Sequence, residues 1–586
     1  MGDEKIFSGT EQTRQSLRPP IRGKRHMAVS GHSLATHAAM RMLDRGGNAV
    51  DAGVAGAMCL AVLQPDMVSF AGVAPLLIHH APSGKTLAVT GLGPWPAAAD
   101  TDLFLQHHQG AVPDGILRTV VPGAPDALIL ALREFGTLRF ADIAADALDL
   151  AQNGFPMHQF LHNGILEAES AYRARPENSA VFLPGGKVPE VNEIFVQKDL
   201  ATTLRAMVQA EATSGKDRIS GLQAARDVLY TGTIGKKIAQ FHAEHGGLLT
   251  LADLAGFSSD LEAPLGFSFG NYTVLTHNAW CQGPVLPMTL NILDGIDLKS
   301  MGHNSPLYIH TIAEALKLAF ADRERLFGDP RFVDVPIRGL LSPAYGGQRR
   351  ARISDAAWTI MPPSDDPFAA EGRFAPPTFH PDSDPENIGG NSYTPDTSYI
   401  CVTDQWGSFF SATPSDMSFD TPLIPGTGLA VSSRGSQSWA VPGHPSCIEG
   451  GKRPRLTPTG CLILREGKPW MILGTPGGDV QCQTNLQVLF NVILFGMDPQ
   501  EAVEAPRFAT FCFPDSFSPH TCNKGILRLE SRISRDTAAA LSAFGHRVHL
   551  WPDWSWKAGG ACLIVRDGPV MTGGADPRRE CCAMAW

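Results

Sequence analysis

Hydrophobic positions become dense only from Met27 onward, after a polar and charged N-terminal stretch. We interpret residues 1–26 as a mobile arm, because they hold too few apolar side chains to build a core. From Met27 the pattern predicts a strand, a helix that ends at Gly46–Gly47, and a buried helix from Asn48. Two apolar runs around Pro82–Ser83–Gly84 then predict a β-hairpin.

Amphipathic helices are predicted for most of residues 123–260, for example at Ala124–Phe135 and Asp199–Ser214. The strongest helical pattern follows in SPLYIHTIAEALKLAFADRERLFGDP, which Gly328 and Pro330 close. The N-terminal part of the chain is therefore expected to contribute mainly helices.

Composition changes between residues 361 and 396, where Pro, Asp, Ser and Gly dominate and predict an exposed loop. Directly after it, TSYICVTDQWGSFFSATPS predicts two strands joined by a turn at Asp404–Gly407. A hairpin in CLILREGKPWMILGTPGG, a helix from Asp479 to Phe495 and a last strand near ACLIVRD follow. Because strands and helices come in runs on both sides of the loop, we predict one layered α+β domain built jointly by both halves.

Composition and charge exclude several kinds of partner. Apolar residues make up 43% and charged residues 18%, as in ordinary globular proteins. The net charge of −10 and the absence of a basic block argue against nucleic acid. The longest apolar run, residues 52–63, is too short for a bilayer, so no membrane partner is expected.

The cysteines and the N-terminus suggest a compartment. The 11 cysteines are scattered without a CxxC pair, which fits free thiols, and residues 1–24 show no secretory signal. We therefore expect a cytoplasmic protein. His242 and His245 lack a third ligand, and no phosphate-binding or dinucleotide fingerprint is present, so neither a metal nor a cofactor is expected.

The junction between loop and strand offers chemistry. If the bond between Asp396 and Thr397 were cut, Thr397 would carry a free α-amine beside its hydroxyl. The amine, with a pKa of roughly 7.7–8.0, could act as the base that a weak hydroxyl nucleophile needs. A threonine at a strand start is also an ordinary β-former, so the junction alone leaves both interpretations open.

A glycine pair supplies candidate oxyanion donors. In ILGTPGGDVQ an apolar strand leads through Gly477 and Gly478 into a helix. Backbone N–H groups at such a helix start can approach a ligand closely and favour negative charge. The same pattern also occurs in ordinary strand–helix turns.

Taken together, these segments resemble a known family. DTSYICVTDQWG, GKRPRLTP, LGTPGGDVQ followed by PQEAVEAPRF, and GGADPR resemble the gamma-glutamyltransferase family, as do RGGNAVDA, VPGAPDAL and GGLLTLADLAGF nearer the N-terminus. The motifs follow the family's order from about residue 27 to residue 578. RGSQS followed by GKRP is similar to the family's cephalosporin-acylase-like branch.

The resemblance implies a fold and a set of chains. It implies a four-layer αββα Ntn-hydrolase sandwich and autoproteolysis at Asp396–Thr397 within the 361–396 loop. The products would be a large subunit, 27–396 after the arm, and a small subunit, 397–586, which remain together as a heterodimer.

Position by position, the resemblance assigns the chemistry. Thr397 falls on the catalytic threonine, and Ser415 falls on a second threonine whose hydroxyl supports the nucleophile. Gly477 and Gly478 fall on the oxyanion glycines.

The residues that would recognise a glutamyl group differ. The family's carboxylate-binding arginine corresponds to Thr101, and its amine-binding aspartate corresponds to Gln437. A nearby asparagine corresponds to Met417, and a serine pair to Leu456 and Thr457. Since a buried charge-assisted hydrogen bond contributes roughly 1.5–3 kcal/mol, γ-glutamyl binding should be weakened by orders of magnitude. Arg434 and Arg455 could replace these contacts, or be structural arginines.

We therefore predict an enzyme that cleaves a γ-glutamyl-like or other carboxylated small-molecule acyl amide through an acyl–threonine intermediate. One alternative is a true gamma-glutamyltransferase or glutathione hydrolase with rebuilt glutamate contacts. Another, from a different class, is an inactive Ntn-fold binding protein.

Overall fold

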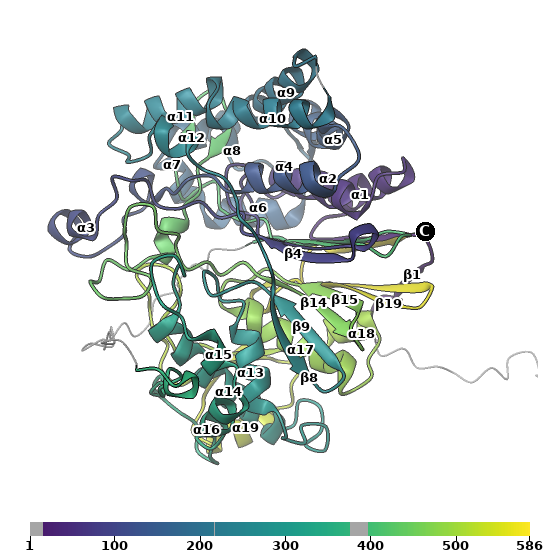
Figure 1. Cartoon of the computed structure of the whole chain (residues 1–586), viewed down its shortest axis with the longest axis vertical. Coiled ribbons are helices and arrows are strands. Elements are labelled where there is room, and N and C mark those ends of the chain that lie inside the picture. The colour runs from purple at the N-terminus through teal and green to yellow at the C-terminus, as the bar shows by residue number, and fades with distance from the viewer. Residues whose placement is uncertain (1–15, 216, 375–396) are drawn as a thin grey trace, which may run out of the picture.

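The computed structural model describes residues 16–374, apart from residue 216, and residues 397–586. It is a mixed helix-and-sheet protein, in which two antiparallel sheets lie between groups of helices (Figure 1). Asp396 and the rest of 375–396 lie outside the described residues, as do residues 1–15. Among the described helices, none combines the length and the hydrophobicity that a membrane span requires.

The first sheet joins strands from both sides of residue 396. Its seven strands, in spatial order, are β21 (Cys582–Ala585), β2 (Met27–Ser30), β10 (Ile400–Thr403), β11 (Phe409–Ala412), β3 (Leu76–His80), β4 (Lys85–Val89) and β7 (Leu261–Glu262). The two hairpins predicted from sequence, β3–β4 and β10–β11, are confirmed.

The second sheet is likewise shared. Its seven strands are β1 (Ile21–Gly23), β20 (Val570–Ala575), β19 (Cys562–Asp567), β15 (Lys468–Gly474), β14 (Gly460–Arg465), β9 (Tyr272–Thr276) and β8 (Leu265–Phe269). The predicted hairpin β14–β15 is confirmed. Two expectations are corrected here: Ile21–Gly23 of the supposed arm pairs with β20, and two strands follow β19 instead of none.

Strand periodicity separates two cores. Successive side chains of a strand point to opposite faces, so Ile400 and Val402 join the helix-facing core while Tyr399 and Cys401 join the core between the sheets. All four residues of β10 are buried because both of its faces are covered. The hairpin that carries Thr397 is thus fixed from both sides.

Helices cover the outer face of each sheet (Figure 1). Those on the first sheet include α1 (Ser33–Asp44), α2 (Ala49–Leu63) and α4 (Ala124–Phe135). Those on the second include α13 (Val285–Leu293), α14 (Pro306–Leu326) and α17 (Val480–Ile493). The remaining helices are α3 (Thr101–His108), α5 (Phe140–Asn153), α6 (Gln159–Glu167), α7 (Glu169–Arg173), α8 (Pro176–Phe182), α9 (Lys198–Thr213), α10 (Arg218–Tyr230), α11 (Thr233–Glu244), α12 (Leu251–Ala255), α15 (Ile337–Leu340), α16 (Pro343–Arg350), α18 (Pro499–Glu504) and α19 (Arg535–Ala543).

Three small sheets complete the strands. They are β5 (Phe155–Pro156) with β6 (Ile194–Phe195), β12 (Leu423–Ile424) with β13 (Leu429–Ala430), and β16 (Phe508–Thr510) with β17 (Ile526–Glu530) and β18 (Arg547–Trp551).

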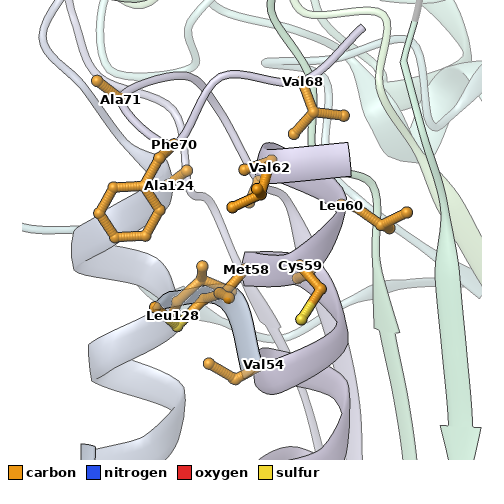
Figure 2. Close-up of a cluster of buried hydrophobic side chains, with 14 of the residues drawn as sticks. Val54, Met58, Cys59, Leu60, Val62, Val68, Phe70, Ala71, Ala124 and Leu128 are labelled. Atoms are coloured by element: carbon orange, nitrogen blue, oxygen red, sulfur yellow. The ribbon is translucent and has the colours of Figure 1, made fainter. Parts of the chain in front are cut away.

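Helix α2 lies closely on the β10–β11 hairpin because it carries glycines on that side. A Cβ on Gly53 would lie 1.9 Å from the Phe410 ring, and one on Gly56 would lie 2.2 Å from Ile400. On another side, Val54, Met58 and Val62 face Leu128 of α4 (Figure 2). The fully buried α2 thus packs between the β10–β11 hairpin and α4.

The loop predicted for 361–396 is partly packed where it is described. Phe368 is buried in the second helical core, and Asp365 pairs with Arg349 and Arg352. Phe368 and Asp365 anchor this first part, whereas residues 363, 366, 369, 370 and 372–374 are exposed.

Close packing between the sheets gives a test. A Cβ on Gly474 would lie 2.1 Å from the Tyr399 ring, so Gly474→Ala should force the sheets apart and cost about 1–3 kcal/mol. Chemical denaturation measures the loss. Gly347→Ala in α16 is the matched control, since its new methyl group meets only Arg350 Nη2 at 3.6 Å. Equal stability of both variants would contradict tight packing at Gly474.

Candidate active site

Thr397 and Ser415 face each other across the end of the β10–β11 hairpin. The register that pairs Ile400 with Ala412 continues to a bridge between Thr397 and Ser415. Their side-chain oxygens lie 2.8 Å apart, and both residues are buried. Ser415 N–H also donates to Val73 O at 2.9 Å, which ties the pair to the neighbouring chain. The hairpin therefore sets two hydroxyls at hydrogen-bonding distance.

A buried arginine from the part of the chain after residue 396 contacts this pair. Arg434 Nη2 donates to Ser415 Oγ, and its Nε lies 3.1 Å from Asp416 Oδ1. Arg434 is fully buried, and its guanidinium carbon lies 5.3 Å from the centre of the Phe517 ring. Arg434 thus belongs to the surroundings of Thr397 and Ser415.

The glycine pair lies between β15 and α17, as predicted. Gly477 has φ 126° and Gly478 φ 55°, which favour glycine. Val480 N–H donates to Gly477 O at 2.9 Å and begins the helix. Within the described part of the chain, neither glycine N–H donates to another residue. Such N–H groups at a helix start can stabilise an oxyanion.

Two contacts bring the chain around this turn close to Thr397. Gly474, at the end of β15, lies against the Tyr399 ring, two residues from Thr397. Arg579 Nη1 donates to Thr397 O at 3.5 Å, and its side chain covers Gly560, whose N–H donates to Thr475 Oγ1 at 3.0 Å. The start of β10 and the end of β15 are therefore held at one edge of the sheet pair.

Gln437 and Thr457 belong to a continuous buried network. Gln437 Nε2 donates to Thr457 Oγ1 at 2.9 Å, and Gln282 Nε2 donates to Thr457 O at 3.0 Å and to Gly478 O at 2.9 Å. Gln437 Oε1 has no partner among the described residues. This network joins two of the predicted substrate-binding residues to the glycine turn.

Thr101 and Arg455 are committed elsewhere. Thr101 Oγ1 donates to Ile448 O at 2.5 Å at the start of α3. Arg455 is buried and pairs with Glu324 at 2.7 Å. Burial alone would raise the pKa of Glu324, but the charge of Arg455 and the contacts with His444 and Arg323 hold it well below its usual range. Arg455 thus has a structural partner in place of a substrate.

The sequence motifs did not predict several residues of the site. Asp416, Gln282 and Arg579 contact the predicted residues, but they lie in segments without a motif of their own. Asp416 adjoins Ser415, but the turn predicted at Asp404–Gly407 would pair Thr403 with Ser408, whereas the structure pairs Thr403 with Phe409 and thereby Thr397 with Ser415.

A cavity of about 330 Å³ lies beside Arg434. Met417, Phe419 and Phe517 form apolar walls, and Ser436 contributes a hydroxyl. The other lining residues are Asp114, Arg118, Glu167, Ala168, Ser170, Ala171, Arg175, Asp420, Asp515, Ser518, Pro519 and Thr521.

Both lining arginines of this cavity are engaged. Arg118 pairs with Asp420, and Arg175 donates to Phe419 O at 2.8 Å. Burial, together with the charge of Asp479, raises the pKa of Asp515. The cavity therefore offers apolar walls and acidic groups more than a cation for a carboxylate.

One buried group of possible metal ligands is His310, Glu314 and His546, whose ligand atoms lie within 4.8 Å of one another. His310 Nε2 donates to Ser354 O at 2.7 Å, His546 Nε2 lies 2.9 Å from His310 Nδ1, and Lys317 Nζ lies 3.5 Å from His546 Nδ1. Protons on these donors account for every contact, so an ion is not required.

A second such group is His32, His158 and Glu580. His32 Nδ1 accepts from Leu34 N–H at 3.2 Å, so the neutral ring carries its proton on Nε2, the atom that faces Glu580. His158 Nδ1 lies 2.7 Å from Glu580, and its pKa is raised: burial lowers it, but the contacts with Glu580 outweigh burial. An ion pair explains the group.

Comparison with known proteins covers nearly the whole chain. The profile of the family described as gamma-glutamyltranspeptidase matches residues 35–586. The chain is 32% identical over 574 residues to the acylase ACY 1 proenzyme of Pseudomonas sp. (strain SE83), covering 95% of this chain and 92% of that protein. It is 30% identical over 564 residues to a glutathione hydrolase-like proenzyme of Bacillus subtilis, covering 95% and 98%. A cephalosporin acylase from Bacillus halodurans superimposes with a TM-score of 0.83 at 26% identity, covering 100% of this chain and 99% of that one.

The Arg455–Glu324 pair gives a test of structural against substrate-binding roles. Arg455→Met leaves a buried carboxylate without its main cation, so it should cost about 3–5 kcal/mol at neutral pH. The difference in unfolding free energy between wild type and Arg455→Met should shrink below about pH 4.5. A carboxylate whose pKa is lowered in the folded protein stabilises the fold at pH values above its unfolded pKa, and this contribution is lost as the pH falls. Urea denaturation at both pH values measures it.

The matched control is Arg465→Met, which breaks a partly exposed pair with Asp567. Such pairs contribute less than about 1 kcal/mol, so little change is expected. An Arg455→Met protein as stable as this control, with only weakened substrate binding, would contradict the structural role.

Proposed function

Because the chain belongs to the gamma-glutamyltranspeptidase family, we propose that it is an autoprocessing amidohydrolase or acyltransferase whose nucleophile is Thr397. Membership and the acylase and glutathione hydrolase relatives make it an enzyme of amide chemistry. The observation that carries the assignment is the 2.8 Å contact between Thr397 Oγ1 and Ser415 Oγ.

The chemistry proceeds through an ester. Cleavage between residues 396 and 397 frees the α-amine of Thr397, which takes the hydroxyl proton while Oγ1 attacks the substrate carbonyl. The N–H groups of Gly477 and Gly478 stabilise the oxyanion. The C–N bond then breaks, and the amine leaves with the proton. Water or an acceptor amine attacks the acyl–Thr397 ester and restores the hydroxyl.

The cut would leave one folding unit. We propose the four-layer αββα arrangement of Ntn-hydrolases, made jointly by a large chain ending at residue 396 and a small chain starting at Thr397. Both sheets contain strands from both parts: β2 lies between β21 and β10, and β14 lies beside β9. Separation would break both sheets, which supports a stable heterodimer.

Substrate recognition differs from a γ-glutamyl site. Gln437 supplies a neutral amide where the family has an amine-binding carboxylate, and Thr101 and Arg455 are engaged in structural contacts. We propose that the substrate is an amide whose acyl group lacks the α-amine. This acyl group is a carboxylated one or another acyl group. A true gamma-glutamyltransferase would need contacts to both charged groups that these residues do not supply.

Cleavage of the chain before residue 397 tests whether Thr397 is the nucleophile. Purified wild-type protein should show two chains, and N-terminal sequencing of the smaller should begin at Thr397. Thr397→Ala should stay uncut and lack turnover, because it removes the attacking oxygen. Thr403→Ala removes a hydroxyl at the other end of β10, which donates to Ser408 O, and this variant should still be cut. A persistently uncut, inactive wild-type chain would support the inactive binding protein instead.

Substrate preference tests the recognition. The kcat/KM of the processed enzyme for a glutaryl anilide should exceed that for the γ-glutamyl anilide by about 100-fold, because the two differ only in the α-ammonium, which would be buried without a charge-assisted partner. Gln437→Asp should narrow this ratio by restoring a carboxylate for the amine. A wild-type preference for the γ-glutamyl anilide would refute the proposal on recognition while leaving the Thr397 chemistry intact.

A further inference from the structure

Arg434 is fixed in place by a buried acidic anchor. Asp416 Oδ1 lies 3.1 Å from Arg434 Nε and also accepts from Ser433 N–H at 3.1 Å. Asp416 Oδ2 accepts from Ser432 Oγ at 2.8 Å. Burial raises the pKa of Asp416, and Arg434 together with these donors opposes that rise. The carboxylate therefore holds the guanidinium in one orientation.

The backbone around this anchor is shaped for it. Asp416 adopts φ 104°, a conformation that side-chain-bearing residues rarely take. A Cβ on Gly72 would lie 2.2 Å from Ser415 O and 2.9 Å from Asp416 Cβ, so only glycine lets this segment approach. The unusual backbone turns Asp416 towards Arg434 while the preceding Ser415 keeps its contact with Thr397.

The direction of the hydrogen bonds follows from the chemistry of arginine. A guanidinium can only donate, so Ser415 Oγ must accept from Arg434. An oxygen that accepts from a cation becomes a better donor through its own proton. That proton can reach Thr397 Oγ1, which lies 2.8 Å away. The series of donors therefore ends on the nucleophilic oxygen.

We infer that Arg434 is a positioning residue that acts through Ser415 to orient and activate Thr397, and that it does not bind the substrate's carboxylate. This inference rests on the proposed function and deepens it. As Oγ1 gives its proton to the α-amine, the hydrogen bond from Ser415 strengthens with the charge that develops on Oγ1. During deacylation the same bond stabilises Oγ1 as it leaves the acyl carbon and regains its proton from the ammonium.

The cation has a second effect on the base. A positive charge near the new α-amine disfavours the ammonium form, so more of the amine is free to accept a proton. Loss of Arg434 should therefore move the rising limb of the pH–rate profile to higher pH. A purely structural arginine would change stability and leave this limb where it is.

The experiment uses the full chain and its processed form. Arg434→Gln, Ser415→Ala and the double variant are compared for the rate of chain cleavage and for turnover of two anilides, one glutaryl and one butyryl. We expect Arg434→Gln to lower kcat about 100-fold for both anilides and to leave KM nearly unchanged. This loss is of the size seen when one oxyanion donor is removed. The rising limb should shift by about half a pH unit or more.

The double variant identifies the route. If Arg434 acts through Ser415, the double variant should have a kcat only slightly lower than that of Ser415→Ala. Arg434→Lys should restore only part of kcat, because an ammonium cannot reach both Ser415 and Asp416 as a planar fork does. Arg349→Gln removes another fully buried arginine, paired with Asp322 and Asp365, and controls for general damage to the fold.

Two results would overturn the inference. A raised KM for the glutaryl anilide alone would make Arg434 the partner of a substrate carboxylate. Additive losses with an unmoved pH limb would make it a structural residue. A wild-type chain that is neither cut nor active would instead refute the proposed function. If the wild type is cut and active and Arg434→Gln has the same cleavage rate and turnover, only this inference is refuted.

Discussion

The register of the β10–β11 hairpin is the constraint on which the site depends. A shift by one residue would turn every side chain of β10 to the opposite face and separate Thr397 from Ser415. The register is fixed because Ile400 and Val402 must lie under α2 while Tyr399 and Cys401 must lie between the sheets. Packing of the two cores thus determines the 2.8 Å contact between the hydroxyls.

Buried charge around this hairpin divides into two separate clusters. Arg434 and Asp416 lie beside Ser415, whereas Arg455 pairs with Glu324 of α14. Desolvating such groups is costly, and each pair is tolerated because its partners are already in place. Both arginines that looked available for a substrate carboxylate therefore already have an acidic partner within the protein.

The sequence predicted the parts of this molecule that depend on local patterns. Hairpins β3–β4, β10–β11 and β14–β15 follow from alternation and turn residues, and α4 follows from its apolar stripe. It missed β1 and β21, because Ile21–Gly23 and Cys582–Ala585 become strands only by pairing with β20 and β2. For the same reason it could name Arg434 and Arg455 but not their partners: Asp416 and Glu324 are joined to them by tertiary contacts alone.

The division between chemistry and recognition has a structural basis. Thr397 and Ser415 are held by hairpin register, and the Gly477–Gly478 turn begins a helix, so the fold itself maintains their geometry. Thr101, Met417 and Gln437 lie outside the long strands of either sheet, at a helix start, in a loop and in a short 3₁₀ turn. Met417 lines the cavity, and a substitution there changes the cavity wall without altering sheet packing. Under the proposed function, the fold keeps the acyl-transfer chemistry while the group presented to Thr397 changes.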